Sequence, residues 1–189
     1  MMNRRQFVYA AASAAMLARA SNVLAATYDV IVKGGRVIDP SLRINAIRDV
    51  AIAGGRIAAV EADIAADAEE TIDARGRLVV PGLLDIHTHY ARDNEGPTVC
   101  LADGVTGWID AGSQGADHIA DSVAVAKSAP QQGRVLINIG RAGILPGGDT
   151  MDISRADVGA AKAAIARNRD FIVGVKARLS RNVAADAFE

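Results

Sequence analysis

The sequence predicts an α/β protein in which a small β unit precedes a parallel sheet with helical crossovers, either open or barrel-like. Three observations predict this class. Residues 28–81 hold short strand candidates separated by glycine turns, and after Pro81 apolar strand candidates alternate with helical segments. The composition, 50% hydrophobic and 23% charged over 189 residues, is that of a globular protein long enough to bury a core.

The N-terminal β unit is predicted to be antiparallel. Its strand candidates are rich in β-branched residues and lie at Tyr28–Lys33, Arg36–Ile38, Asp49–Ala53, Arg56–Val60, Glu70–Asp73 and Arg77–Val80. The pair Gly54-Gly55 suits a two-residue hairpin turn.

The second part is predicted to alternate strands with helices. The strand candidates are short apolar runs at Leu83–His89, Val105–Asp110, Val135–Ile139 and Phe171–Arg178. One helix is expected over residues 115–128. Another is expected from a capping box at Ser154–Asp157 to about Asn168.

Residues 1–26 have the pattern of an export signal. Arg4-Arg5 is followed by an apolar stretch, Phe7–Leu17, and by small residues. The paired arginines with Phe7 and Val8 resemble a twin-arginine signal, which predicts a periplasmic location. The stretch is shorter than the roughly 20 residues that span a bilayer. A cytosolic amphipathic helix is the alternative.

The charge and the cysteine content exclude some kinds of partner and an internal cross-link. The formal net charge is −1 without a basic block, so nothing indicates binding to nucleic acid or to an anionic membrane. Cys100 is the single cysteine, which excludes an internal disulfide. We therefore expect no nucleic acid among the partners, and no membrane span.

A pair of histidines ends the first strand after Pro81. On an ideal strand, Asp85, His87 and His89 point one way, and Leu84, Ile86 and Thr88 point toward covering helices. Two imidazoles spaced in this way can converge on one metal ion. The alternative is a pair that only forms hydrogen bonds at the strand end. Asp85 is expected to orient His87.

The segment around these histidines resembles the signature of a known family. Val79–His89 reads Val-Val-Pro-Gly-Leu-Leu-Asp-Ile-His-Thr-His, which is similar to the amidohydrolase superfamily. Gly34–Pro40 and Gly54–Ile57 are similar to its N-terminal β-sandwich. Ile109–Ser113 and Gly174–Ser180 resemble the deacetylase branch, whose relatives include dihydroorotase and hydantoinase. The resemblance runs from Tyr28 to the last residue.

The resemblance implies a partial TIM-type (β/α)8 barrel. A β-sandwich part at 27–80 would precede about four βα units at 81–189, whereas a full barrel takes about 250 residues. It also implies a metal site at the C-terminal mouth, with His87 and His89 on one ion and Lys176, as a carboxylated lysine, bridging two. Zinc is the expected metal, one or two ions, with manganese or iron as alternatives.

The strand pattern around Lys176 is compatible with that role. Alternation places Ile172, Gly174, Lys176 and Arg178 on one face, opposite an apolar face that meets the helices. A carbamate would present anionic oxygens to a metal, where an ammonium would repel it. The alternative is an interior lysine paired with a carboxylate or reaching the surface. Asp110, at the end of another strand, either faces the mouth or caps the next turn.

The family site is expected to be incomplete in this chain. The resemblance implies two further histidines and a general-base aspartate, but the sequence has three histidines and none follows His118. The catalytic base is therefore unknown and expected beyond the chain end. Two open sheet edges and an exposed apolar interior should result. Three hypotheses remain: an N-terminal fragment, a split enzyme with a complementing second chain, and a non-catalytic metal-binding remnant. A homo-oligomer stays open.

The predicted activity is metal-dependent hydrolysis of amide or ester bonds in a small acylated substrate, as in a deacetylase. The alternative enzyme is a cyclic-amide hydrolase of the dihydroorotase or hydantoinase kind. Both rest on the resemblance.

Overall fold

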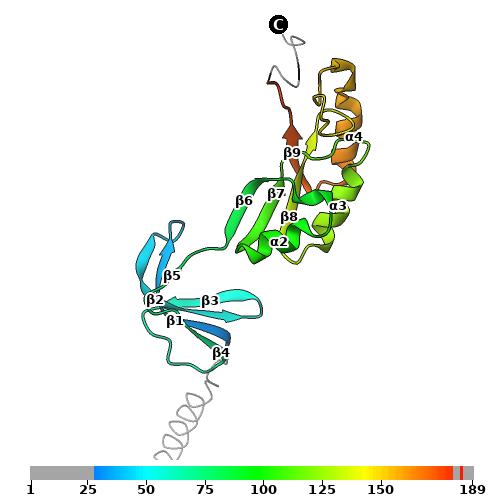
Figure 1. Ribbon diagram of the computed structural model, residues 1–189. Helices are drawn as coiled ribbons and strands as arrows, with labels where there is room; N and C mark the ends of the chain where they lie inside the picture. Colours follow the sequence, from blue (N-terminus) through cyan, green and yellow to red (C-terminus); the bar gives the residue numbers. More distant parts are fainter. Residues whose placement is uncertain (1–27, 181–183, 185–189) are drawn as a thin grey trace, which may run out of the picture. The chain divides into compact units, whose positions relative to one another are not determined.

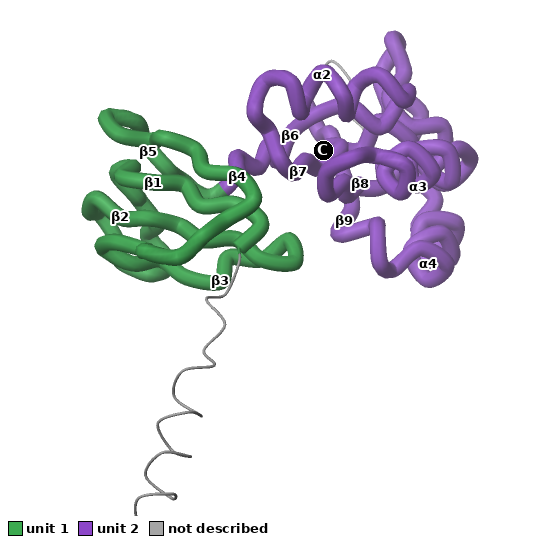
Figure 2. The backbone as a smooth tube through the Cα atoms, turned by 90° about the horizontal axis from the view of Figure 1, so that it is seen from below, with its two compact units in different colours: residues 1–81 green, residues 82–189 purple. Residues whose placement is uncertain are grey.

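The computed structural model describes residues 28–180 and Ala184 (Figure 1). The export signal predicted over residues 1–26 lies outside the described residues. The chain divides into two compact units, with the boundary between Pro81 and Gly82 (Figure 2). In the described part, none of the helices combines the length and apolar character needed to cross a membrane.

The described strands of the first unit form one five-stranded sheet. They are β1 (Tyr28–Asp39), β2 (Ile44–Ala53), β3 (Arg56–Glu61), β4 (Ala68–Asp73) and β5 (Leu78–Val79). β1, β2 and β3 are antiparallel neighbours, whereas β4 and β5 pair with β1 in parallel. The prediction of an antiparallel unit is therefore wrong for β4 and β5. After β3 the chain crosses to the other side of β1, where β4 runs parallel to β1.

Glycines shape two places in this sheet. Gly54 and Gly55 both have positive φ, +58° and +69°, as a two-residue hairpin turn of type I′ requires. This confirms the predicted hairpin. Gly34 and Gly35 do not separate two strands as predicted. Instead, β1 continues through them with a shift of its register against β2, so that β1 pairs first with β4 and then with β5.

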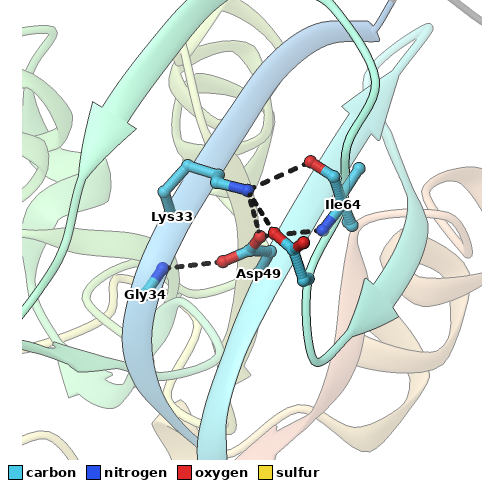
Figure 3. A network of polar contacts seen from close by, with 5 residues as sticks. Lys33, Gly34, Asp49 and Ile64 are labelled. Carbon is cyan, nitrogen blue, oxygen red and sulfur yellow. Dashed lines mark hydrogen bonds and ion pairs between the residues drawn. The ribbon is translucent and has the colours of Figure 1, made fainter.

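A buried carboxylate holds this irregular point together (Figure 3). Asp49 on β2 is 3% exposed and accepts hydrogen bonds from the backbone N–H groups of Gly34 (2.7 Å) and Ile64 (2.9 Å). The Nζ of Lys33 lies 2.6 Å from Asp49 Oδ2 and also donates to Asp63 and to the carbonyl of Ile64. One side chain thus links the bulge of β1 to the loop that follows β3.

The second unit contains the four predicted parallel strands, in the order β6-β7-β8-β9. They are β6 (Leu83–Thr88), β7 (Val105–Asp110), β8 (Gln132–Asn138) and β9 (Ile172–Lys176). The helices between them are α2 (Gly96–Ala102), α3 (Ile119–Ser128) and α4 (Val158–Arg167), with short 3₁₀ turns η1 (Tyr90–Arg92) and η2 (Ile153–Arg155). This arrangement confirms the predicted α/β class with four strands of a parallel, barrel-type sheet.

Both helices expected from the sequence begin later than predicted, and α3 begins at Ile119 instead of residue 115. α4 begins at Val158, and its N-cap is Asp157, whose side chain accepts a hydrogen bond from the backbone N–H of Ala160. Ser154 belongs instead to η2, which Asp152 caps. The predicted capping box at Ser154 is therefore wrong, because two aspartates cap two separate turns.

The hydrophobic core of this unit lies where helices cover the sheet. Trp108, Val135, Ile137 and Ile172 pack there with Val123 of α3 and other buried residues. The sheet edges are open in the described part. Leu84 and Ile86 on β6 are 61% and 65% exposed, and Val173 and Val175 on β9 are 53% and 48% exposed. The prediction of open edges with exposed apolar residues on the sheet is thereby confirmed.

The register of β9 corrects one sequence expectation. Ile172 pairs with Val135 in the core, whereas Lys176 pairs with Asn138, and a shift separates the two pairings. Because Asn138 follows the core residue Ile137 directly, Lys176 lies on the face opposite the helices. Ile172 and Lys176 therefore do not share a face.

Candidate metal centre

The predicted ligands lie at the carboxyl ends of their strands. His87 is the second-to-last residue of β6, and His89 follows that strand directly. Lys176 is the last residue of β9. Because all four strands are parallel and lie side by side, their carboxyl ends are on the same side of the sheet. That side is where parallel α/β folds place their ligands.

The two imidazoles are close neighbours. The ring centroids of His87 and His89 are 5.9 Å apart, with an angle of 82° between the planes. Both residues are exposed. Over the described residues 28–180, no three side chains of His, Cys, Asp and Glu converge in a way that could hold a metal ion. The described part thus offers two imidazoles, fewer than the four ligands typical of zinc.

Asp85 contacts the backbone of His87 rather than its ring. Its Oδ1 accepts a hydrogen bond of 3.0 Å from the backbone N–H of His87. The pairing of β6 with β7 is irregular between Asp85 and Thr88, and Asp85 pairs with the buried Trp108. The faces predicted for Leu83–His89 are therefore wrong, because Leu84 and Ile86 are exposed and do not meet the covering helices. Asp85 lies on the helix-covered face and supports the irregular backbone beside His87.

His89 rests against the loop that follows β7. Its Nδ1 lies 2.8 Å from Ser113 Oγ, and Ser113 is 2% exposed. The pKa of His89 is lowered, above all because its ring is partly removed from water although the residue as a whole is exposed. Arg92, His87 and Lys176 add to the lowering, and Asp110 opposes it. A lowered pKa favours the neutral imidazole, the form that binds metals.

Asp110 caps the turn after β7, which decides between its two predicted roles. It is 1% exposed, and its carboxylate accepts hydrogen bonds from the N–H of Ser113 (2.7 Å), from Ser113 Oγ (2.7 Å) and from the N–H of Ala91 (3.1 Å). The same carboxylate therefore binds both the backbone two residues after His89 and the serine that contacts its ring.

Lys176 packs directly against the loop that carries Ser113. A Cβ built on Gly112 would overlap the Cβ of Lys176 and lie 2.8 Å from its Cγ. Lys176 is half-buried, and no carboxylate of the described residues forms an ion pair with it. The lysine and His89 are thus joined through consecutive residues, Gly112 and Ser113.

Sequence reasoning missed Ser113 and a second buried polar group beside it. Asn138 Nδ2 donates to the Gly112 carbonyl (3.1 Å) and to Asp149 Oδ2 (3.1 Å). Asn138 and Asp149 are each 1% exposed. The run Asp110-Ala111-Gly112-Ser113 was recognised as similar to a family, but its spacing alone does not indicate which side chain meets His89. The third histidine, His118, is the exposed N-cap residue of α3.

Comparisons with known proteins agree on one family. A deacetylase from Enterococcus faecalis is 34% identical over 168 residues, which is 84% of this chain and 43% of that protein. A solved adenine deaminase has a TM-score of 0.68 at 32% identity and covers 85% of this chain and 44% of its own. A solved dihydroorotase has a TM-score of 0.70 at 25% identity, covering 82% and 44%.

No protein-family model matches the chain. The chain spans less than half of the length of the relatives that it matches. Within that span the similarity includes both the sheet of the first unit and the parallel sheet of the second, since more than four fifths of the chain is covered. By sequence and by fold, this chain belongs to the amidohydrolase superfamily, with deacetylases and dihydroorotases among its relatives.

Proposed function

We propose that this chain contributes His87, His89 and a carboxylated Lys176 to the divalent-metal site of a hydrolase. That hydrolase cleaves the amide or ester bond of a small acylated substrate, as a deacetylase does. The observation that carries the proposal is that the three side chains lie at or just after the carboxyl ends of parallel strands, with His89 and Lys176 both next to the turn that follows β7. The rings of His87 and His89 lie edge to face. His89 contacts Ser113, and the residue before it, Gly112, packs against Lys176.

The residues at these strand ends fit part of a metal site. Two neutral imidazoles are nitrogen donors suited to zinc, manganese or iron. Lys176 has no ion-pair partner among the described carboxylates, and its neutral amine would add to carbon dioxide and release a proton to give the carbamate. When bound, the metal would polarise a carbonyl and make water more acidic. The remaining ligands and the general base belong to the rest of such a site, and zinc is the metal that we propose.

Metal content of the full chain, purified with excess zinc and then dialysed, tests this proposal. We expect wild type to retain zinc and His89→Ala to lose it. His118→Ala is the matched control, because this third histidine lies on the surface at the start of α3. Equal zinc retention in all three proteins would contradict the proposal.

The role of Lys176 has its own test. We expect a carbamate signal in the ¹³C spectrum after incubation of the zinc-loaded chain with labelled bicarbonate. Lys176→Arg should abolish the signal, and Lys162→Arg, at an exposed position on α4, should leave it unchanged. A signal that survives Lys176→Arg would assign the carbamate to another amine.

A cyclic-amide hydrolase is the second candidate for the activity. It is supported by the solved dihydroorotase, which has a TM-score of 0.70 and covers 82% of this chain. A panel of acyl-amides, acyl-esters and cyclic amides distinguishes the candidates. The panel should be run on the chain together with any polypeptide that supplies the remaining ligands. Turnover of cyclic amides alone would favour the second candidate.

We also propose export by the twin-arginine route, supported by Arg4-Arg5 and the short apolar stretch after them. Changing both arginines to lysine should keep the chain in the cytoplasm of a bacterial host, as cell fractionation would show. Unchanged export would contradict this route.

A further inference from the structure

The hydrogen bonds around His89 form a directed chain. Asp110 Oδ2 and Ser113 Oγ are 2.7 Å apart, and Ser113 Oγ and His89 Nδ1 are 2.8 Å apart. An ionised carboxylate only accepts hydrogen bonds, so the serine hydroxyl donates its single hydrogen to Asp110. The hydroxyl then has only lone pairs to offer to His89.

The direction of these hydrogen bonds determines which tautomer the His89 imidazole adopts. Because Ser113 Oγ accepts, the hydrogen of the neutral ring must be on Nδ1 of His89. The other nitrogen, Nε2, keeps its lone pair and is the atom free to bind a metal. A neutral imidazole without such a partner exchanges between two tautomers and has the Nε2 lone pair for only part of the time.

The same carboxylate also fixes the backbone beside the ring. Asp110 accepts the N–H of Ala91, two residues after His89, at 3.1 Å. On the other side of His89, the carbonyl of Thr88 accepts the N–H of Ala111 at 2.7 Å. The ring and the backbone on both sides are therefore tied to the end of β7. This is the support that a preorganised ligand requires.

His87 provides an internal contrast. In the described part of the chain, the hydrogen bond beside this residue joins Asp85 to its backbone N–H, and its ring nitrogens have no hydrogen-bond partner. Its tautomer is therefore not selected by Ser113. Within the His-X-His pair, the His89 ring has a hydrogen-bond partner among the described residues and the His87 ring has none.

We propose that Ser113 and Asp110 are positioning residues that hold His89 in the Nδ1–H tautomer and present its Nε2 to the metal. This inference rests on the proposed metal role of His89. The tautomer itself belongs to the metal-free chain, so it is measurable before any metal is added.

The decisive measurement is the two-bond ¹H–¹⁵N spectrum of the metal-free full chain labelled in histidine. It is recorded well above the ordinary histidine pKa of about 6.5, where the rings are neutral. We expect His89 to be in the Nδ1–H form and His87 to show a mixture. Ser113→Ala should move His89 toward a mixture of the two tautomers. Ser113→Thr, which keeps the hydroxyl, should retain the Nδ1–H form of wild type.

Ser122→Ala is the matched control. Ser122 is 0% exposed and loses a comparable hydrogen bond, to the carbonyl of Ala91, without touching the His89 ring. It should leave the tautomer unchanged. An Nε2–H form of His89 in wild type would overturn the proposal, and this result needs no variant to fold. So would a His89 tautomer that Ser113→Ala does not alter.

Zinc affinity separates this proposal from the proposed function. Loss of a residue that orients a metal ligand typically weakens binding about 10- to 100-fold. We expect that loss for Ser113→Ala and none for Ser122→Ala. If the tautomer depends on Ser113 but wild type binds no zinc, the positioning role stands and the metal function fails. If zinc binds tightly and the tautomer is independent of Ser113, the metal function stands and the positioning role fails.

Discussion

Gly112 leaves the space that the side chain of Lys176 occupies. The two residues come from different strand ends, and a Cβ on Gly112 would overlap the Lys176 Cβ. Gly112 also has a φ of +80°, a conformation that other L-residues adopt only with strain. Two independent requirements therefore keep this position a glycine.

Gly112→Ala should destabilise the second unit and displace Lys176. The positive φ alone costs about 1–2 kcal/mol, and the overlap adds about 1–3 kcal/mol. The control is Gly104→Ala, with φ +83° and no atom within 4 Å of the added Cβ. Urea unfolding of both variants measures the difference. Equal losses would show that Lys176 moves aside without cost.

Asp49→Asn should lower the stability of the first unit. The amide retains one acceptor oxygen where the carboxylate serves the N–H groups of both Gly34 and Ile64. A buried donor left without an acceptor costs about 1–3 kcal/mol. Asp63→Asn is the control, because its side chain is 80% exposed and binds only Lys33. Denaturant unfolding should show a clear loss for Asp49→Asn and little change for Asp63→Asn.

The same carboxylate predicts a dependence of stability on pH. Burial would raise the pKa of Asp49, but the hydrogen bonds from Lys33, Ile64 and Gly34 outweigh it, and the net pKa is lowered. A lowered pKa in the folded state means that the unfolded state takes up the proton first as the pH falls. The stabilisation is thus complete above about pH 4, the ordinary aspartate value, and is lost as the pH falls through the lower folded value.

Acid titrations of stability for wild type and Asp49→Asn should therefore converge at low pH. The gap between the two curves should be constant above the ordinary aspartate pKa and should close below it. A gap that stays constant down to the lowest pH would mean that the charge of Asp49 does not contribute.

The open edges of the second unit predict self-association. Unpaired edge strands with exposed apolar side chains favour edge-to-edge contact, and lysine on an edge strand opposes it. Ile86→Lys and Val175→Lys, on β6 and β9, should reduce the average mass in sedimentation velocity. Val158→Lys adds the same charge at a 62% exposed site on α4 and should have less effect. An equal effect of all three would point to net charge instead of the edges.

Local patterns predicted the strands of the second unit well. Val105–Asp110 is a strand over the same residues in the structure, because an apolar run between glycines and polar residues leaves few other choices. The Gly54-Gly55 turn was predictable because two glycines readily adopt the positive φ angles of a type I′ turn. Strand irregularities were not, since the shifts beside Asp85 and Ile172 depend on the neighbouring strand.

The surroundings of the candidate site were less predictable than its position. His87, His89 and Lys176 come to one edge because parallel strands align their carboxyl ends. The contact between His89 and Ser113 joins residues 24 positions apart. It depends on how the turn after β7 folds over Asp110, and no sequence period encodes that.

The pairing of β1 also has a consequence for the order of folding. β1, β2 and β3 are neighbours along the chain and can assemble through short turns, so their contacts require little loop closure. β4 and β5 reach β1 only after the chain has passed through the other two strands. We therefore expect the three-strand meander to form early, with the parallel strands added last as the slow step.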